Sequence, residues 1–149
     1  MTAVATSGVI ITGGASGIGL ATAAALVREG RPVAIWDLGS ERIEAAVESL
    51  SGGTPVFGAV VDVTDHERVA AATAESRAAL GSIGGLVHSA GNIISEPIGE
   101  IDWSHWSSQI DTHLNAYARI VQEVLPHLRE CEDAAVVAIS SINGLIAEA

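Results

Sequence analysis

The sequence contains no lysine, and this absence limits what the protein can bind. All seven of its basic residues are arginines, against 18 acidic residues, which gives a formal net charge of −11. Nucleic acid is bound through a basic surface that neutralises phosphates, so this charge balance argues against a nucleic-acid-binding protein. We therefore expect no nucleic-acid partner.

Cysteine and long apolar runs are also scarce. Cys131 is the only cysteine, which excludes an internal disulfide and a multi-thiolate metal site. The five histidines include no pair at the i, i+4 spacing of a helical zinc site, so we expect no metal. No apolar run approaches the roughly 18 residues of a membrane span, and the start lacks the basic segment of a signal peptide. The sequence predicts a cytoplasmic protein without a membrane partner.

Short apolar segments of strand length alternate with longer segments at helical spacing. The strand candidates are residues 8–12, 32–37, 55–62, 84–90 and 134–140, and the helix candidates are residues 17–29, 40–50, 65–80 and 103–130. This alternation is typical of parallel strands joined by right-handed crossovers, and continuously apolar strands indicate helices on both faces. We predict one α/β domain over residues 1–149, with a doubly wound parallel sheet of about five strands.

The last strand candidate, "AAVVAI", is apolar at every position. Such a strand is expected to be covered on both faces and to have a neighbour on each side. Because only a few residues follow it, we expect the sheet to be truncated at its C-terminal edge.

A glycine-rich turn, "TGGASGIG" at residues 12–19, lies between the first strand candidate and the first helix candidate. Gly13 permits a tight turn, Gly17 lets the backbone approach a pyrophosphate, and Gly19 lets the helix lie close to the sheet. The N–H groups at the helix start, at the positive end of the helix dipole, then bind phosphates. This turn predicts nucleotide binding by a Rossmann-type domain; the alternative is an ordinary strand-to-helix turn.

An acidic residue, Asp37, ends the second strand candidate. It can accept hydrogen bonds from the adenosine ribose, whereas the 2′-phosphate of NADP would meet like charge, a repulsion of roughly 4 kcal/mol at about 4 Å and an effective dielectric near 20. Leu38 and Gly39 follow, and Arg42 lies within the next helix, so we expect no arginine beside Asp37. We predict NAD as the cofactor, with NADP less favoured; a helix-start acid is the alternative role for Asp37.

Taken together, these residues resemble the short-chain dehydrogenase/reductase family, whose cofactor loop has the TGxxxGIG form of residues 12–19. The resemblance extends over residues 4–149. It implies that Asp62 contacts the adenine beside Val63, and that the small residues Ala90 and Gly91 let the backbone pass close to the cofactor. The implied cofactor residues are Gly13, Ser16, Gly17, Ile18, Gly19, Asp37, Asp62, Val63, Ala90 and Gly91.

Two positions depart from the family's Asn-Asn-Ala-Gly motif, which here reads His88-Ser89-Ala90-Gly91. Further along, alignment on Trp106 places the family's active-site asparagine at His113. Ser141, in "ISS" at residues 139–141, aligns with the catalytic serine that hydrogen-bonds the substrate carbonyl. The alternatives are an ordinary helix residue for His113 and a strand-end cap for the serines.

The proton-transferring pair of the family has no counterpart. The family uses a tyrosine with a lysine one helical turn away, because a free phenol with a pKa of about 10 transfers protons poorly near neutrality. This sequence has no lysine, and its only tyrosine is Tyr117, four residues after His113. A substitute pair on that helix face is possible by spacing, but Tyr117 fits a core-facing aromatic equally well. The chain resembles the N-terminal, cofactor-binding part of a dehydrogenase, ending just after its catalytic serine.

Two functions therefore stay open. The first is an NAD-dependent oxidoreductase acting on an alcohol or ketone, of which these residues hold the dinucleotide half and which alone lacks full activity. The second is a non-catalytic dinucleotide-binding module or a partner-dependent subunit, because bare apolar surface tends to bind another chain. We expect a homo-oligomer, since the family's long helix commonly lies at a subunit contact. A Rossmann-type methyltransferase fits the glycine spacing less well.

Overall fold

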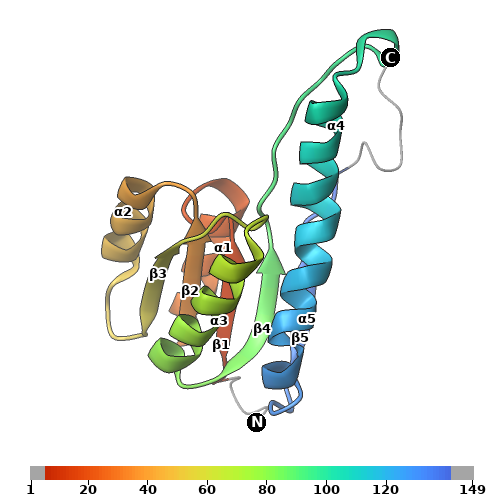
Figure 1. Ribbon diagram of the computed structural model, residues 1–149. Coiled ribbons are helices and arrows are strands. Elements are labelled where there is room, and N and C mark those ends of the chain that lie inside the picture. Colours follow the sequence, from red (N-terminus) through yellow and green to blue (C-terminus); the bar gives the residue numbers. More distant parts are fainter. Residues whose placement is uncertain (1–5, 142–149) are drawn as a thin grey trace.

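Five parallel strands form one sheet in the computed structural model, which describes residues 6–141 (Figure 1). The strands are β1 (Gly8–Thr12), β2 (Val33–Asp37), β3 (Val56–Val60), β4 (Ile83–His88) and β5 (Ala135–Ala138). Their order in the sheet is β3-β2-β1-β4-β5, and every neighbouring pair is parallel. The chain builds outward from β1 in both directions, so the doubly wound Rossmann-type fold predicted from the sequence is confirmed.

Helices cover both faces of this sheet (Figure 1). The four that pack on it are α1 (Gly17–Arg28), α2 (Ser40–Leu50), α3 (His66–Leu80) and α5 (Ala116–Leu128). Val9 and Ile11 of β1 belong to the core under α1 and α2, whereas Ile10 belongs to the core under α3 and α5. Each central strand contributes side chains to the cores on both faces of the sheet. Every residue of β1 and β2 is therefore buried, which explains their largely apolar sequences.

The helix expected over residues 103–130 is not one regular helix. A short 3-10 turn, η1 (Ile98–Glu100), comes first, and α4 (Trp103–Ile110) then leads through a π-helical turn, η2 (Asp111–Asn115), into α5. A π turn is a local irregularity that sequence periodicity does not reveal, and such turns are frequent at functional sites. In Figure 1, α4 extends beyond the sheet on the side where the strands end.

The strand β5 lies at the edge of the sheet and is poorly covered. It pairs with β4 along one side, and no strand lies on its other side within residues 6–141. All four of its residues are exposed, including Val136 and Val137 at 37% and 48%.

None of the helices within residues 6–141 combines the length and the apolar character that a membrane span requires.

Candidate functional site

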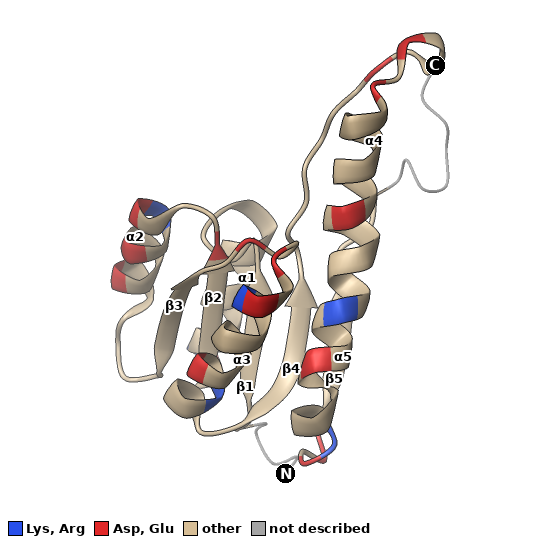
Figure 2. Cartoon of the chain, in the orientation of Figure 1, with Lys and Arg blue, Asp and Glu red and all other residues tan. Residues whose placement is uncertain are grey.

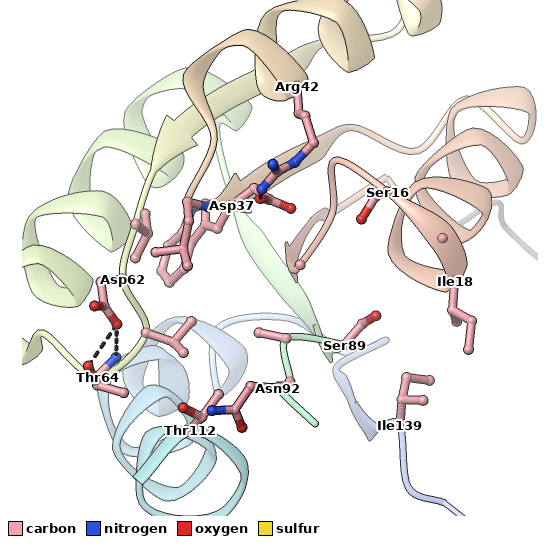
Figure 3. Close-up of a pocket in the computed structure, with 18 of the residues that line it drawn as sticks. Ser16, Ile18, Asp37, Arg42, Asp62, Thr64, Ser89, Asn92, Thr112 and Ile139 are labelled. Carbon is pink, nitrogen blue, oxygen red and sulfur yellow. Dashed lines mark hydrogen bonds and ion pairs between the residues drawn. The ribbon is translucent and has the colours of Figure 1, made fainter. Parts of the chain in front are cut away.

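A cavity of about 590 Å³ opens at the carboxyl ends of the strands (Figure 3). Ligands of open α/β sheets bind at this edge, where the strand order reverses. Nine of the ten residues expected to serve a cofactor line the cavity: Gly13, Ser16, Gly17, Ile18, Asp37, Asp62, Val63, Ala90 and Gly91. The tenth, Gly19, lies behind the turn, where a Cβ atom would collide with the carbonyl of Gly13.

Two glycines of the turn adopt left-handed backbone conformations. Gly13 has a φ of 63°, and a Cβ atom there would lie 2.9 Å from both the carbonyl oxygen of Ser89 and the amide nitrogen of Ala90. Gly17 has a φ of 51°, but the space around its missing Cβ is open. Gly13 therefore permits close packing against the end of β4, while Gly17 leaves bare backbone facing the cavity.

The start of α1 faces the same cavity with its amide groups. Ser16 is the N-cap in extended conformation, and its side chain makes no capping hydrogen bond. The first turn of α1 carries no acidic residue that would compete for the amides. The unpaired N–H groups and the positive end of the helix dipole therefore favour an anion between Ser16 and Ile18 (Figure 3).

Asp37 ties the end of β2 to the glycine turn. Its side chain is only 8% exposed. Oδ2 accepts a hydrogen bond from the Ala15 amide at 3.2 Å, and Oδ1 accepts one from the Leu38 amide at 2.9 Å. These bonds fix the carboxylate at the cavity wall.

Arg42 corrects the expectation that no arginine stands beside Asp37. It lies in α2 as expected, but its Nη2 atom is 2.7 Å from Oδ1 of Asp37. Because α2 begins at Ser40, Arg42 occupies its first turn and reaches back across Gly39, where a Cβ atom would lie 2.7 Å from the guanidinium carbon. The sequence signal that could have revealed this contact is the place of Arg42 in the first helical turn after the strand.

The pKa of Asp37 reflects opposing effects. Burial raises this pKa, but hydrogen bonds from Arg42 and from the backbone amides of Gly39, Ala15 and Leu38 outweigh burial and hold it below its ordinary value. Asp37 is therefore an ionised and paired carboxylate at neutral pH.

Elsewhere acidic side chains are spread over α2, α3 and the loops, and basic ones are few (Figure 2).

Asp62 follows β3, the strand beside β2, and lies exposed at the cavity (Figure 3). Its Oδ1 accepts hydrogen bonds from the amide and the hydroxyl of Thr64, at 2.9 Å and 2.7 Å. This local turn holds the carboxylate in place, and the neighbouring Val63 is buried at 9% exposure.

The catalytic candidates do not line this cavity. His113 is exposed in η2, with Nε2 2.7 Å from the carbonyl oxygen of Asn92, and its ring packs against Gly91. Ser141 is exposed and is not among the described lining residues. Tyr117 is half-buried, with its ring centroid 5.6 Å from that of His88. The described residues thus bring the cofactor candidates together but leave His113 and Ser141 outside the lining.

Several lining residues were missed from the sequence. Asn92 lies in the loop after β4, and its side-chain amide donates to the Ser108 hydroxyl at 3.2 Å. Ser108 and Thr112 are four residues apart, a spacing that places them on one helix face and that could have been noticed. The missed lining residues are Trp36, Leu38, Arg42, Val61, Thr64, Ser89, Asn92, Ser108, Thr112 and Ile139.

Within residues 6–141, no group of three or more His, Cys, Asp or Glu side chains could hold a metal ion.

Known proteins share both the sequence and the fold. The sequence model of the family described as short chain dehydrogenase matches residues 7–149. A 2-dehydro-3-deoxy-L-rhamnonate dehydrogenase (NAD(+)) from a Sphingomonas strain is 38% identical over 136 residues, which are 91% of this chain and 53% of that protein. A 3-oxoacyl-[acyl-carrier-protein] reductase from Chlamydia muridarum is 33% identical over 138 residues, 91% of this chain and 56% of that protein.

Solved structures agree with this family. The NADPH-bound structure of a short chain oxidoreductase from Pseudomonas aeruginosa, described as containing an atypical catalytic center, has a TM-score of 0.90 at 32% identity and covers 95% of this chain and 56% of its own. A short-chain type dehydrogenase/reductase from Mycobacterium ulcerans has a TM-score of 0.87 at 28% identity, with 95% and 54% covered. The chain spans about half the length of the relatives it matches. On these matches, its Rossmann-type sheet and its glycine turn, this chain belongs to the short-chain dehydrogenase family.

Proposed function

We propose that this chain binds NAD in the cavity at the strand ends, as the cofactor-binding part of an oxidoreductase that acts on a small alcohol or ketone. The observation that carries the proposal is the convergence of nine expected cofactor residues on one cavity of about 590 Å³. This volume lies within the range of about 300–1,000 Å³ that is usual for ligand pockets.

The residues present fit a dinucleotide along the length of the cavity. The open space at Gly17 and the amides at the start of α1 would hold the pyrophosphate. Asp37 would accept hydrogen bonds from the adenosine ribose, and Asp62 with Val63 would flank the adenine. When bound, the nicotinamide of such a cofactor accepts or donates a hydride.

The finer proposal is that NAD is preferred to NADP. Asp37 is buried and fixed by several hydrogen bonds, whereas the side chain of Arg42 is 57% exposed and anchored at Asp37 through one atom. An NADP 2′-phosphate would therefore meet a fixed negative charge and a movable positive one. The ribose diol of NAD adds no charge and needs only the carboxylate.

A second candidate function is a non-catalytic dinucleotide-binding module or a partner-dependent subunit. The sequence has no lysine, and the ring of its only tyrosine packs beside His88, away from the cavity lining. Without a positioned general acid, hydride transfer is typically slower by a factor of about 10²–10⁴. The homo-oligomer and the cytoplasmic location stay predictions.

Calorimetric titration with NAD⁺ and NADH tests the first proposal. We expect the wild-type chain to bind both, and Gly17→Ala to bind at least about tenfold more weakly, because a methyl group would enter the open space over the turn. Gly30→Ala is the matched control. Gly30 also has a positive φ, 76°, and open space at its missing Cβ, but it lies at the end of α1 outside the lining. Both variants carry a backbone cost of roughly 1–2 kcal/mol, because alanine disfavours the left-handed conformation. A folded wild-type chain that releases no heat with either nucleotide would disprove the proposal.

Turnover by the chain alone tests the second candidate function. If the chain is a binding module or an incomplete catalytic unit, we expect it to bind NAD and to show no measurable rate with a panel of secondary alcohols and ketones. Sedimentation velocity in the same buffer shows whether a stable assembly accompanies binding. A substantial rate from the chain alone would exclude the non-catalytic candidate.

A further inference from the structure

The hydroxyl of Thr12 has three polar neighbours behind the cavity wall. Its Oγ1 atom lies 3.2 Å from the Ser89 amide nitrogen, 3.1 Å from the Ala90 amide nitrogen and 2.9 Å from Nδ1 of His88. The Thr12 side chain is fully buried, and His88 is only 4% exposed. Water therefore has little access to this cluster, and its hydrogen bonds must be satisfied internally.

Donor and acceptor counting fixes the direction of each bond. A threonine hydroxyl has one proton and two acceptor lone pairs. The amides of Ser89 and Ala90 can only donate, and both are directed at Oγ1, with the Ser89 amide shared between Oγ1 and the backbone carbonyl of Thr12 at 3.2 Å. Among these three neighbours only Nδ1 of His88 can accept the buried Thr12 O–H, which requires Nδ1 without a proton. His88 is consequently the neutral tautomer with its proton on Nε2.

We propose that His88 is a positioning residue for the cofactor site: its unprotonated Nδ1 accepts the Thr12 hydroxyl and so turns both Thr12 lone pairs toward the amides of Ser89 and Ala90. Ser89 and Ala90 line the cavity and lie against Gly13, which connects this cluster to the glycine turn. Protonation of His88 at Nδ1 places an N–H group against the hydroxyl, removes the acceptor of the Thr12 proton and leaves three donors at Oγ1, which disturbs its contacts with the Ser89 and Ala90 amides. Cofactor affinity is therefore linked to the protonation of His88; this part of the inference rests on the proposed NAD site.

The groups around His88 favour the neutral form. The ring of Tyr117 from α5 lies against it, and His113 lies on η2. The adjacent positions on the neighbouring strands, Thr12 on β1 and Ala138 on β5, are uncharged. On α3, which covers the same face of the sheet, Arg68 and Glu75 pair with each other at 2.9 Å. Among these groups no carboxylate faces the imidazole.

Burial lowers the pKa of His88, the charge of His113 lowers it further, and the backbone of Thr112 only partly offsets them. Nε2 has no hydrogen bond of regular geometry within residues 6–141. A second proton on this ring would therefore be poorly stabilised, and His88 is neutral at neutral pH.

Two variants and one spectrum test the inference. In His88→Asn, the side-chain oxygen takes the place of Nδ1 as an acceptor but does not titrate, whereas His88→Leu has no acceptor. In the wild type, imidazole ¹⁵N spectra at about pH 7 should show Nδ1 unprotonated and Nε2 protonated. By calorimetry at that pH, His88→Asn should bind NAD⁺ within about threefold of the wild type, and His88→Leu about three- to tenfold more weakly. As the pH is lowered from about 7.5 through the range in which the ¹⁵N spectrum shows His88 taking up its second proton, the wild type should lose about three- to tenfold more affinity than His88→Asn, because only the wild type takes up this proton.

Each readout can overturn the inference. A proton on Nδ1 in the spectrum contradicts the hydrogen-bond assignment without any use of NAD. Equal losses of NAD⁺ affinity on acidification in the wild type and His88→Asn contradict the proton linkage, and wild-type affinity in a folded His88→Leu contradicts the positioning role. If His88→Leu does not fold, the spectrum and His88→Asn still decide. A folded wild type that binds no NAD⁺ overturns the proposed function and the cofactor part of this inference, while the tautomer is decided separately by the spectrum.

Discussion

The Nη2 atom of Arg42 lies 2.7 Å from Oδ1 of Asp37, so the carboxylate expected to select the cofactor carries its own counter-charge. The carboxylate is buried, and the arginine is largely exposed. The pair therefore combines a fixed acceptor with a mobile donor at the adenosine end of the cavity. This relationship decides how strongly the site discriminates against a 2′-phosphate.

Removal of the Arg42 side chain should sharpen the preference for NAD. In Arg42→Ala, the charge of Asp37 is no longer balanced, and a 2′-phosphate meets a repulsion of roughly 4 kcal/mol at about 4 Å and an effective dielectric near 20. We expect NADP⁺ affinity to fall at least about tenfold and NAD⁺ affinity to change by less than about threefold. Calorimetric titrations with both nucleotides measure the ratio. Arg28→Ala, which removes an exposed arginine from the far end of α1, is the control and should leave the ratio unchanged. A ratio in Arg42→Ala equal to that of Arg28→Ala would contradict this prediction.

Asp37 should contribute stability that depends on pH. Its pKa is lower in the folded state than in the unfolded chain, so folding favours the ionised form. The contribution is complete above the unfolded pKa of about 3.9 and is lost as the pH falls through the folded pKa. We expect Asp37→Asn to reduce the free energy of unfolding by about 1–3 kcal/mol at neutral pH, because the Arg42 bond loses its charged acceptor. Urea denaturation from about pH 7 to pH 3 should show the difference between wild type and variant shrinking below about pH 4. A difference that stays constant over this range would rule out the linkage.

The indole of Trp36 makes a buried hydrogen bond that should be costly to break. Trp36 and Ser76 are both 0% exposed, and Nε1 donates to the Ser76 hydroxyl at 3.0 Å. Ser76→Ala leaves this donor unsatisfied and should lower the free energy of unfolding by about 1–3 kcal/mol. Thr73→Val is a control on the same helix, since Thr73 is equally buried but its hydroxyl bonds only the Val69 carbonyl within α3. Chemical denaturation followed by tryptophan fluorescence compares the two variants, and the prediction fails if Thr73→Val is the more damaging.

A polar cluster at the opposite end of the sheet should also stabilise the fold. Asp133, just before β5, accepts a hydrogen bond from the Ser7 hydroxyl at 3.0 Å, and its Oδ2 lies 3.4 Å from Nη2 of Arg31. Because the carboxylate is 37% exposed, we expect Asp133→Asn to cost only about 1 kcal/mol. The neighbouring Glu132→Gln makes the same change of charge on an exposed side chain and should cost less than about 0.5 kcal/mol. Thermal unfolding of both variants in parallel tests the prediction, which equal losses would refute.

The catalytic half of the family's site could not be judged from sequence spacing alone. The resemblance to the family, aligned on Trp106, implied that His113 takes the position of an active-site asparagine, and the structure places it in a π turn with its ring at the backbone of Asn92. From this segment Ser108 and Thr112 line the cavity, and His113 does not. The roles of His113 and Ser141 therefore stay predictions.

The sequence by itself determined the alternation of strands and helices, the two-sided core and the glycine turn. These features depend on local preferences: apolar runs that need cover on both faces, and glycines that accept a positive φ at Gly13 and Gly17. Only the tertiary structure decided the ion pair of Asp37 with Arg42, the bond between Thr12 and His88 and the π turn. The Thr12 and His88 side chains are 76 positions apart in sequence, and Arg42 reaches Asp37 only through the path of the backbone at Gly39. Contacts of this kind depend on strand register and side-chain direction, which periodicity does not encode.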